Sequence, residues 1–241
     1  MPFTFSHPAI VLPLTYLSRK WFSLTGLVVG SLTPDFEFFI RMRLKGLYGH
    51  TWHGVLWFDL PIGLALAFLF HNIVRNSLLN NLPAFVRSRF PPDSLVNWNH
   101  YFKNNAGVVI LSILLGAVSH IFWDSFTHSH GYFVQQLPAL ANTLTVFNRE
   151  IPIFKILQHG STLAGAFVIA VAIYQLPTHA PTQTQVGLKY WSTIIILTII
   201  IILARVASGL DYMRYGHMIA TAISAGMIAL VLTSVLQRTK E

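Results

Sequence analysis

Five long apolar stretches constrain this chain more than any other feature of its sequence. About 20 apolar residues in a helix cross the hydrocarbon core of a bilayer. Backbone groups in that core must be hydrogen-bonded within the segment, which favours helices, and the regular alternation expected of a membrane barrel is absent. The predicted transmembrane helices cover residues 54–74, 106–123, 160–176, 190–206 and 217–236.

Composition supports an all-α integral membrane helical bundle, which we predict as a single membrane domain over residues 1–241. Apolar residues make up 54% of the chain and charged residues only 10%, against about a quarter charged in soluble domains. The net charge is +8, but the basic residues lie between apolar stretches. We therefore expect them to face the head groups of the lipid bilayer and expect no nucleic-acid partner.

The absence of cysteine excludes disulfides and thiolate metal ligands. The amino-terminal residues have neither a basic start nor a small-residue cleavage site, so we predict no removable signal peptide.

Residues 8–34 allow two interpretations, because Arg19 and Lys20 interrupt an apolar stretch. The stretch forms either a helical hairpin that turns at the basic pair, or a short entry segment followed by one spanning helix. We favour the hairpin, because Pro8 suits a first helical turn and the charges fall in the middle. An amphipathic helix over residues 35–47 is expected to lie in the membrane interface. Residues 75–103 and 128–158 are predicted to be extramembrane loops with short helices, and residues 177–189 a plain connection.

His120, Asp124 and His128 form the densest group of candidate functional residues. Their spacing of four places them on one stripe of a helix, about 6 Å apart. Gly116 lies on the same stripe and allows another segment to approach closely. Imidazole and carboxylate groups in this pattern commonly hold a transition metal, and ionisable groups near a membrane span are usually functional. The alternative is a set of hydrogen-bonded histidines at an interfacial helix end.

The order of the spans brings more candidates to the same end of the bundle. His50 and His53 precede one span, His159 opens another, and a hairpin would return His7 to Asp35. Chance placement would divide such residues between the two ends.

The opening residues, Met-Pro-Phe-Thr-Phe-Ser-His-Pro, resemble a bacterial membrane family called domain of unknown function 4184. The wider pattern resembles membrane-bound metal-dependent hydrolases related in pattern to the zinc phospholipase C superfamily. That pattern contains an amino-terminal His, a Pro-Asp-x-Asp segment, a Thr-His before a span, and a Ser-His-x3-Asp helix followed by Thr. The matching residues here are His7, Pro34-Asp35-x-Glu37, Trp52-His53, Ser119-His120-x3-Asp124 and Thr127.

The resemblance covers roughly residues 1–132 and departs from the pattern twice. Glu37 replaces the second Asp and has a longer arm, and Trp52 replaces the Thr before His53. The resemblance implies a divalent metal, zinc before others, hydrolysis of a phosphoester, and a location in the bacterial cytoplasmic membrane as a multi-pass protein.

The leading hypothesis is therefore a membrane-embedded metal-dependent hydrolase acting on lipid or lipid-linked phosphoester substrates. We predict the metal ligands to be His7, Asp35, His53, His120 and Asp124. The predicted catalytic residues are His128 and Glu37, and the additional candidates are His50 and His159.

Two rival hypotheses stay open. A metal ion transporter is favoured by Asp59 inside its span, with Pro61 able to open the helix beside it. A non-enzymatic membrane scaffold would use the His and Asp residues for hydrogen bonding without metal.

Overall fold

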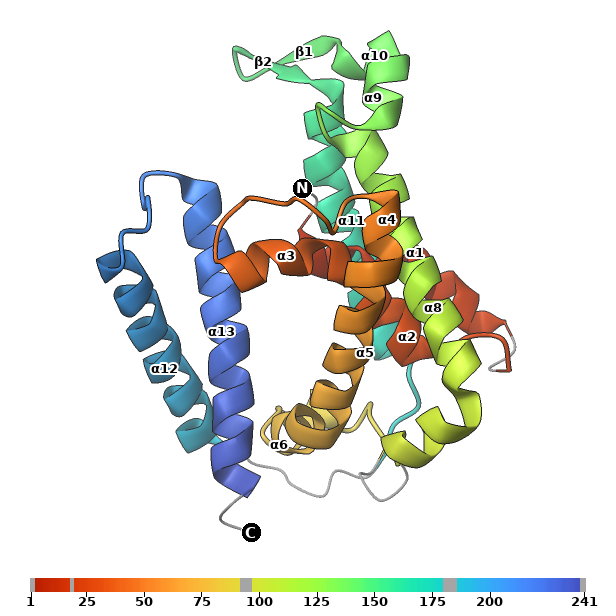
Figure 1. The fold of residues 1–241 in the computed structure, drawn as a ribbon, viewed down its shortest axis with the longest axis vertical. Helices are drawn as coiled ribbons and strands as arrows, with labels where there is room; N and C mark the ends of the chain where they lie inside the picture. The colour runs from red at the N-terminus through yellow and green to blue at the C-terminus, as the bar shows by residue number, and fades with distance from the viewer. Residues whose placement is uncertain (1–2, 18–19, 92–96, 180–185, 239–241) are drawn as a thin grey trace. The chain divides into compact units, whose positions relative to one another are not determined.

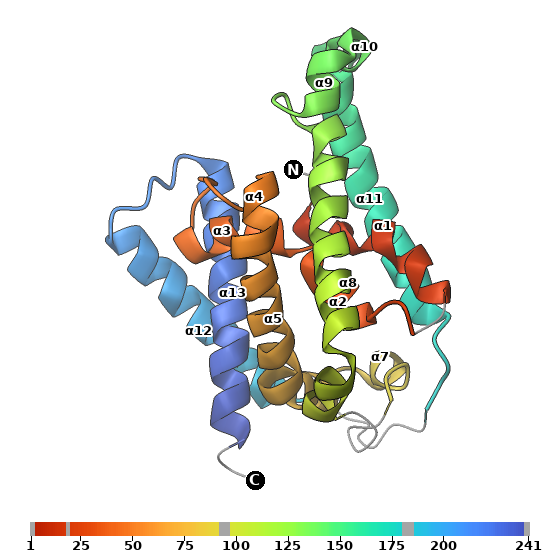
Figure 2. The same cartoon turned by 45° about the vertical axis from the view of Figure 1, so that its right-hand side comes forward.

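The chain is described here by a computed structural model, which covers residues 3–17, 20–91, 97–179 and 186–238. The prediction of an all-α architecture is confirmed, since helices dominate and the described residues contain one small sheet. Figures 1 and 2 show the elements from two directions. In chain order the shorter helical elements are η1 (Thr4–Ser6), α1 (Pro8–Val11), η2 (Leu12–Tyr16), α2 (Leu24–Gly30), α3 (Thr33–Arg41), α4 (Trp52–Gly54), η3 (Val55–Asp59), η4 (Phe70–Val74), α6 (Arg75–Asn80), α7 (Ala84–Arg87), α9 (Tyr132–Gln136) and α10 (Pro138–Ala141).

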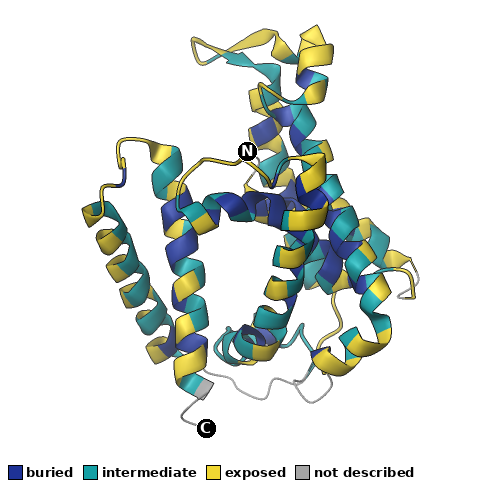
Figure 3. Cartoon of the chain, in the orientation of Figure 1, coloured by how far each residue is buried: buried dark blue, intermediate teal, exposed yellow. Residues whose placement is uncertain are grey.

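Five helices of the described chain are long and apolar enough to cross a membrane, as the five apolar stretches predict. They contain α5 (Leu60–Leu69), α8 (Trp98–Thr127), α11 (Ile153–Tyr174), α12 (Leu188–Ala207) and α13 (Tyr215–Arg238). The complete candidate spans are Trp52–Asn80, Trp98–Gln136, Ile153–Tyr174, Leu188–Ala207 and Tyr215–Gln237. Only 11% of the most apolar window of α11 and of α12 is buried inside the protein, and Figure 3 shows the exposed residues along α12. Such helices suit contact with lipid.

The chain divides into two compact units, and each is described by itself. The first comprises Met1–Asp35, Tyr48–Leu64 and Asn105–Gln175. The second comprises Phe36–Leu47, Ala65–Asn104 and Leu176–Glu241.

The amino-terminal segment of the first unit runs out and back, as the hairpin prediction requires. Pro8 occupies the first turn of α1, and the Ser23 hydroxyl caps α2 by accepting a hydrogen bond from the Gly26 amide. Helix α2 packs against α1 and η2, and each arm is far shorter than the roughly 20 residues that cross a bilayer. Arg19, half of the basic pair expected at the turn, lies outside the described residues.

The predicted interfacial helix is shorter than expected. Helix α3 ends at Arg41, because Met42 has a φ of 50°, in the left-handed region that interrupts an α-helix. The Glu37 carboxylate accepts hydrogen bonds from the Leu47 amide and from Arg41, which fold the following loop back onto the helix.

The segment over residues 128–158, predicted as a loop with short helices, also contains a strand pair that the sequence did not predict. Strands β1 (Thr143–Val146) and β2 (Arg149–Pro152) form an antiparallel pair. Phe147 and Asn148 connect them with φ angles of 49° and 59°, which is the conformation of a two-residue hairpin turn. The short strand pair follows α9 and α10 and precedes α11.

Candidate metal centre

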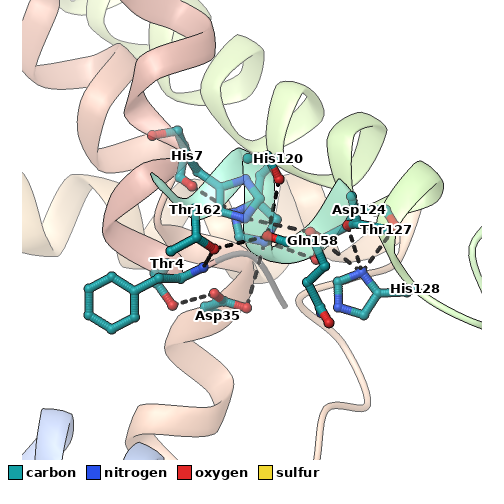
Figure 4. A network of polar contacts seen from close by, with 12 residues as sticks. Thr4, His7, Asp35, His120, Asp124, Thr127, His128, Gln158 and Thr162 are labelled. Atoms are coloured by element: carbon teal, nitrogen blue, oxygen red, sulfur yellow. Dashed lines mark hydrogen bonds and ion pairs between the residues drawn. The ribbon is translucent and has the colours of Figure 1, made fainter. Parts of the chain in front are cut away.

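Five side chains from four segments of the first unit gather in one largely buried cluster. Three histidines and two aspartates form two overlapping triads, and within each triad the ligand atoms lie within 4.8 Å of one another. His120 belongs to both triads. These side chains come from the amino-terminal segment, α3, the loop before α4, and α8, and Figure 4 shows His7, Asp35, His120 and Asp124 among them. The members are His7, Asp35, His50, His120 and Asp124.

The distances between nitrogen and oxygen atoms fall in a narrow range. His50 Nε2 lies 3.4 Å from Asp35 Oδ1 and 3.4 Å from Asp124 Oδ2. His120 Nε2 lies 3.6 Å and 3.4 Å from the same two oxygens, and His7 Nε2 lies 3.5 Å from Asp124 Oδ1. Ligands about 2.0–2.2 Å from a tetrahedral zinc ion are about 3.4 Å apart. The spacing therefore equals that of neighbouring ligands around one ion.

Most of these atoms are buried and have no hydrogen-bond partner among the described residues. They are both ring nitrogens of His7, Nε2 of His120, Oδ1 of Asp35 and both carboxylate oxygens of Asp124. A buried polar atom without a partner is unfavourable by about 1–3 kcal/mol, and more when charged. Several such atoms aimed at one point fit a cation that would coordinate them all.

His120 is held with its Nε2 directed into the cluster. Its Nδ1 lies 2.7 Å from the Ser31 carbonyl oxygen, and because a carbonyl only accepts, Nδ1 carries the proton and donates. In the neutral ring, Nε2 then has a free lone pair, which is the tautomer a metal requires. Gly116 allows this approach, because a Cβ there would lie 2.5 Å from the Leu27 carbonyl oxygen of α2.

His7 is positioned by hydrogen bonds between its own segment and α11. The Phe3 amide donates to the Thr162 hydroxyl, and the Ser6 hydroxyl donates to the Thr162 carbonyl. The His7 ring stacks on His120 with centroids 3.6 Å apart. Burial and the neighbouring His120 lower the pKa of His7 to about 3, so its ring is neutral at pH 7 and available as a ligand.

Asp35 lies in the first turn of α3, where the helix dipole favours a carboxylate. The Thr4 hydroxyl donates a hydrogen bond to Oδ2, which leaves Oδ1 directed at His50 and His120. Burial opposes ionisation of Asp35, but the neighbouring His120 and His50 outweigh burial and hold the pKa below its usual value. Asp35 is therefore a carboxylate that is fully buried.

His50 reaches the cluster from the loop before α4. Gly49 allows the loop to lie against α3, because a Cβ there would lie 2.4 Å from the Pro34 carbonyl oxygen. Burial lowers the pKa of His50, but the carboxylates of Asp124 and Asp35 outweigh burial and raise it. The His50 side chain is 29% exposed, so it lies on the accessible edge of the cluster.

His128 lies beside the cluster and forms the other part of this edge, with a side chain 30% exposed. Its Nδ1 lies 3.0 Å from the Asp124 carbonyl oxygen, to which it donates. Its Nε2 is then unprotonated in the neutral ring, and this buried atom has no hydrogen-bond partner among the described residues. A histidine in this state can accept a proton.

Three predicted or additional candidates lie elsewhere. His53 is exposed in the first turn of α4, which Thr51 caps, and it belongs to neither triad of the described chain. His50, an additional candidate from the sequence, occupies the place predicted for His53. Glu37 pairs with Arg41 at 2.9 Å and accepts from Leu47, and His159 is exposed on α11.

Sequence reasoning missed the residues that support the cluster. Thr4 and Thr162 orient Asp35 and the His7 segment, and the Ser31 carbonyl orients His120. Thr4 is part of the opening motif, so its position in that motif was an available signal. A backbone carbonyl leaves no signal in a sequence.

The two triads could hold one shared ion. His120 Nδ1 is engaged by Ser31, so a single nitrogen, Nε2, is shared by both triads, and one lone pair binds one ion. With neutral histidines the two carboxylates carry a charge of about −2, which a divalent cation balances. The nitrogen and oxygen donor set suits zinc and its neighbours among the transition metals.

The comparisons with known proteins identify a family. Residues 1–235 match the family described as Domain of unknown function (DUF4184). The match confirms the resemblance seen in the opening residues and extends far beyond residues 1–132, whereas the resemblance to zinc phospholipase C-like hydrolases is not supported by it. No curated protein and no solved structure matches the chain.

Proposed function

We propose that this chain, which belongs to the family of Domain of unknown function (DUF4184), is a membrane-embedded metal-dependent hydrolase. The observation that carries the proposal is the convergence of buried nitrogen and oxygen atoms without hydrogen-bond partners among the described residues. A set of residues that served only to stabilise the fold would be expected to satisfy these atoms internally.

The proposed ligands are His7, Asp35, His50, His120 and Asp124. When bound, a divalent ion supplies Lewis acidity that polarises a phosphoryl or carbonyl oxygen and activates water for attack. Thr4 holds Asp35 and the Ser31 carbonyl holds His120, so these two ligands need little reorganisation on binding.

His128 is the proposed proton acceptor. It lies on the accessible edge with His50, whereas the His7, Asp35 and His120 side chains are at most 1% exposed. The hydrogen bond from Nδ1 to the Asp124 carbonyl leaves Nε2 free to accept a proton from an attacking water. Glu37 receives a structural role in this proposal, since Arg41 and the Leu47 amide engage its oxygens.

The proposed substrate is a lipid or lipid-linked phosphoester. His50 comes directly before the candidate span that begins at Trp52, so the accessible edge belongs to the part of the chain near the membrane surface. We propose a phosphoester on the sequence pattern of residues 1–132 alone, because the family match does not support the likeness to zinc phospholipase C-like hydrolases. The proposed location in the bacterial cytoplasmic membrane comes from the same pattern.

Metal analysis and turnover of purified protein test the proposal together. Protein in detergent is expected to retain about one equivalent of zinc or a similar ion and to release phosphate from phosphatidic acid vesicles or from nitrophenyl phosphate. His128→Gln should keep the metal and lose at least about 100-fold in turnover, the usual range for a general base. His120→Gln should lose both. Metal retention without turnover on any phosphoester would contradict the hydrolase and leave the metal site.

A second candidate is transport of a metal ion as cargo, and Asp59 is the observation that favours it. Its carboxylate is fully buried at the end of η3, a π-helical stretch inside the span Trp52–Asn80. Acids buried in membrane helices often mark ion paths. Transport would be favoured over hydrolysis if the parent takes up metal into vesicles, Asp59→Asn abolishes that uptake, and no phosphoester is turned over.

A further inference from the structure

The second unit contains a polar cavity of about 560 Å³ that shares no residue with the metal centre. Its lining residues come from η4, α6, α12 and α13 and from the ends of these helices, and α13 packs against the other three. The volume lies within the roughly 300–1,000 Å³ of small-ligand sites. We call it the asparagine-rich cavity, because Asn72, Asn76, Asn80 and Asn81 line it.

The lining is rich in groups that both donate and accept hydrogen bonds. Besides the four asparagines it includes Gln237 and the hydroxyls of Ser77, Thr193, Thr233 and Ser234. Among the described residues, the lining contains one cationic side chain, Lys189, and no carboxylate. Amides and hydroxyls without a carboxylate suit a ligand that carries several hydroxyl groups and disfavour a metal cation.

The amides of the cavity are partly ordered by one another. Asn81 Nδ2 donates to the Ser77 carbonyl, and both the Ser77 hydroxyl and Asn81 Nδ2 approach Gln237 Oε1, at 3.2 and 3.3 Å. Trp191 Nε1 fixes the backbone here by donating to the Asn81 carbonyl. These contacts hold α6, α12 and α13 together at the cavity.

Two groups in the cavity point to a bound molecule. The Thr233 hydroxyl is buried without a hydrogen-bond partner in the described part of the chain, and Thr233 is 2% exposed. Lys189 forms no ion pair with any described acidic residue. A ligand with a hydroxyl and an anionic group would satisfy both.

The cavity lies at the level expected of lipid head groups. Asn80 ends one candidate span, Lys189 lies in the first turn of a second, and Gln237 ends a third. Spans that meet in this way place the cavity at one membrane surface. Basic pockets between transmembrane helices are known settings for phospholipid head groups.

We infer that the asparagine-rich cavity binds a polyol phosphate, presented as the head group of an anionic phospholipid such as phosphatidylglycerol. Lys189 contacts the phosphate, the amides contact the polyol, and Thr233 completes its hydrogen bonding with a ligand hydroxyl. The site is separate from the proposed hydrolase centre.

Native mass spectrometry of the detergent-purified full chain tests this inference, with short-chain phosphatidylglycerol and phosphatidylcholine as probes. The chain should bind phosphatidylglycerol at least about fivefold more tightly than phosphatidylcholine, from the contribution of one lysine to an anionic lipid. Lys189→Gln should remove that preference. Lys155→Gln, an exposed lysine of α11, is the matched control and should keep it.

Thr233→Val separates binding from folding. The hydroxyl lacks a partner, so the melting temperature of the lipid-free protein should stay the same or rise, while phosphatidylglycerol binding weakens about threefold or more. Glycerol 3-phosphate as a competitor distinguishes a lipid head group from a soluble molecule as the source of the polyol phosphate. Weak competition assigns the site to the lipid. Displacement of phosphatidylglycerol at equal concentration assigns the site to a soluble molecule of the same chemistry. Parental phosphatidylglycerol binding in both Lys189→Gln and Thr233→Val would overturn the inference.

Discussion

Asp124→Asn is the most informative single change in the metal centre. The side chain keeps its shape and loses one negative charge. Its two oxygens lie 3.4–3.6 Å from nitrogens of His7, His50, His120 and His128, so Asp124 pairs with all three histidines of the cluster and with the neighbouring His128.

The magnitude follows from the charge that is removed. Two unit charges 4 Å apart interact by about 4 kcal/mol at an effective dielectric constant of about 20. The carboxylate of a ligand lies closer than that to a doubly charged ion, so we expect a loss of at least about 3 kcal/mol in binding free energy. Since about 1.4 kcal/mol is tenfold, the affinity for metal should fall by about 100-fold or more.

The assay is metal content after equilibration in a zinc buffer with free zinc at about ten times the parental Kd. The parent should then be about 90% occupied and Asp124→Asn about 10% or less, from the arithmetic of a 100-fold change. Asp211→Asn is the matched control, because it removes a carboxylate from an exposed ion pair with Arg214 at 3.0 Å. Its metal content should equal that of the parent.

A thermal-unfolding measurement on the same samples distinguishes the metal site from a scaffold. Zinc at 100 times the Kd should stabilise the parent by about 2.7 kcal/mol and should leave Asp124→Asn almost unchanged. Parental zinc content in folded Asp124→Asn would refute the ligand assignment. Two results together would refute the metal centre in favour of a scaffold. The parent would bind no zinc, and Asp124→Asn would lower the melting temperature in the presence of chelator.

Three further predictions concern single positions. His50→Ala should reduce zinc affinity by at least about 10-fold, whereas His53→Ala should leave zinc affinity unchanged because His53 is exposed and outside both triads; equal effects in the zinc-competition assay would contradict the geometry. Gly116→Ala should destabilise the protein by about 1–3 kcal/mol, because the added Cβ would meet backbone atoms of α2. Gly107→Ala in the same helix is the control: its Cβ meets nothing within 4 Å, so the change should be neutral or stabilising in thermal unfolding. The pKa of His7 falls from 6.5 to about 3 on folding, so between these pH values the unfolded chain binds the additional proton. In chelator, the free energy of unfolding should therefore decline as the pH falls from 6.5 towards 3, by at most about 1.4 kcal/mol per pH unit. His7→Gln should reduce that slope, and unchanged slopes would exclude His7 as its source.

The sequence by itself determined the candidate spans and most of the side chains that converge in the candidate metal centre. Apolar length is a local property that the bilayer thickness converts directly into helices, so all five spans were predictable. The spacing of His120 and Asp124 on one helix is also local, and their positions within a turn of each other follow from helix geometry.

Only the tertiary structure decided which histidine before the span Trp52–Asn80 joins the cluster. His50 and His53 differ by less than one helical turn, and the close approach of Gly49 to Pro34 brings His50 inward while His53 stays exposed. Likewise, α3 ends at Arg41 because Met42 adopts a left-handed conformation, and the strand pair at residues 143–152 turns at the left-handed residues Phe147 and Asn148. Hydrophobic patterns do not encode such conformations. Such features arise from contacts between distant segments, because a contact across the fold selects among conformations that the local sequence leaves nearly equal in free energy.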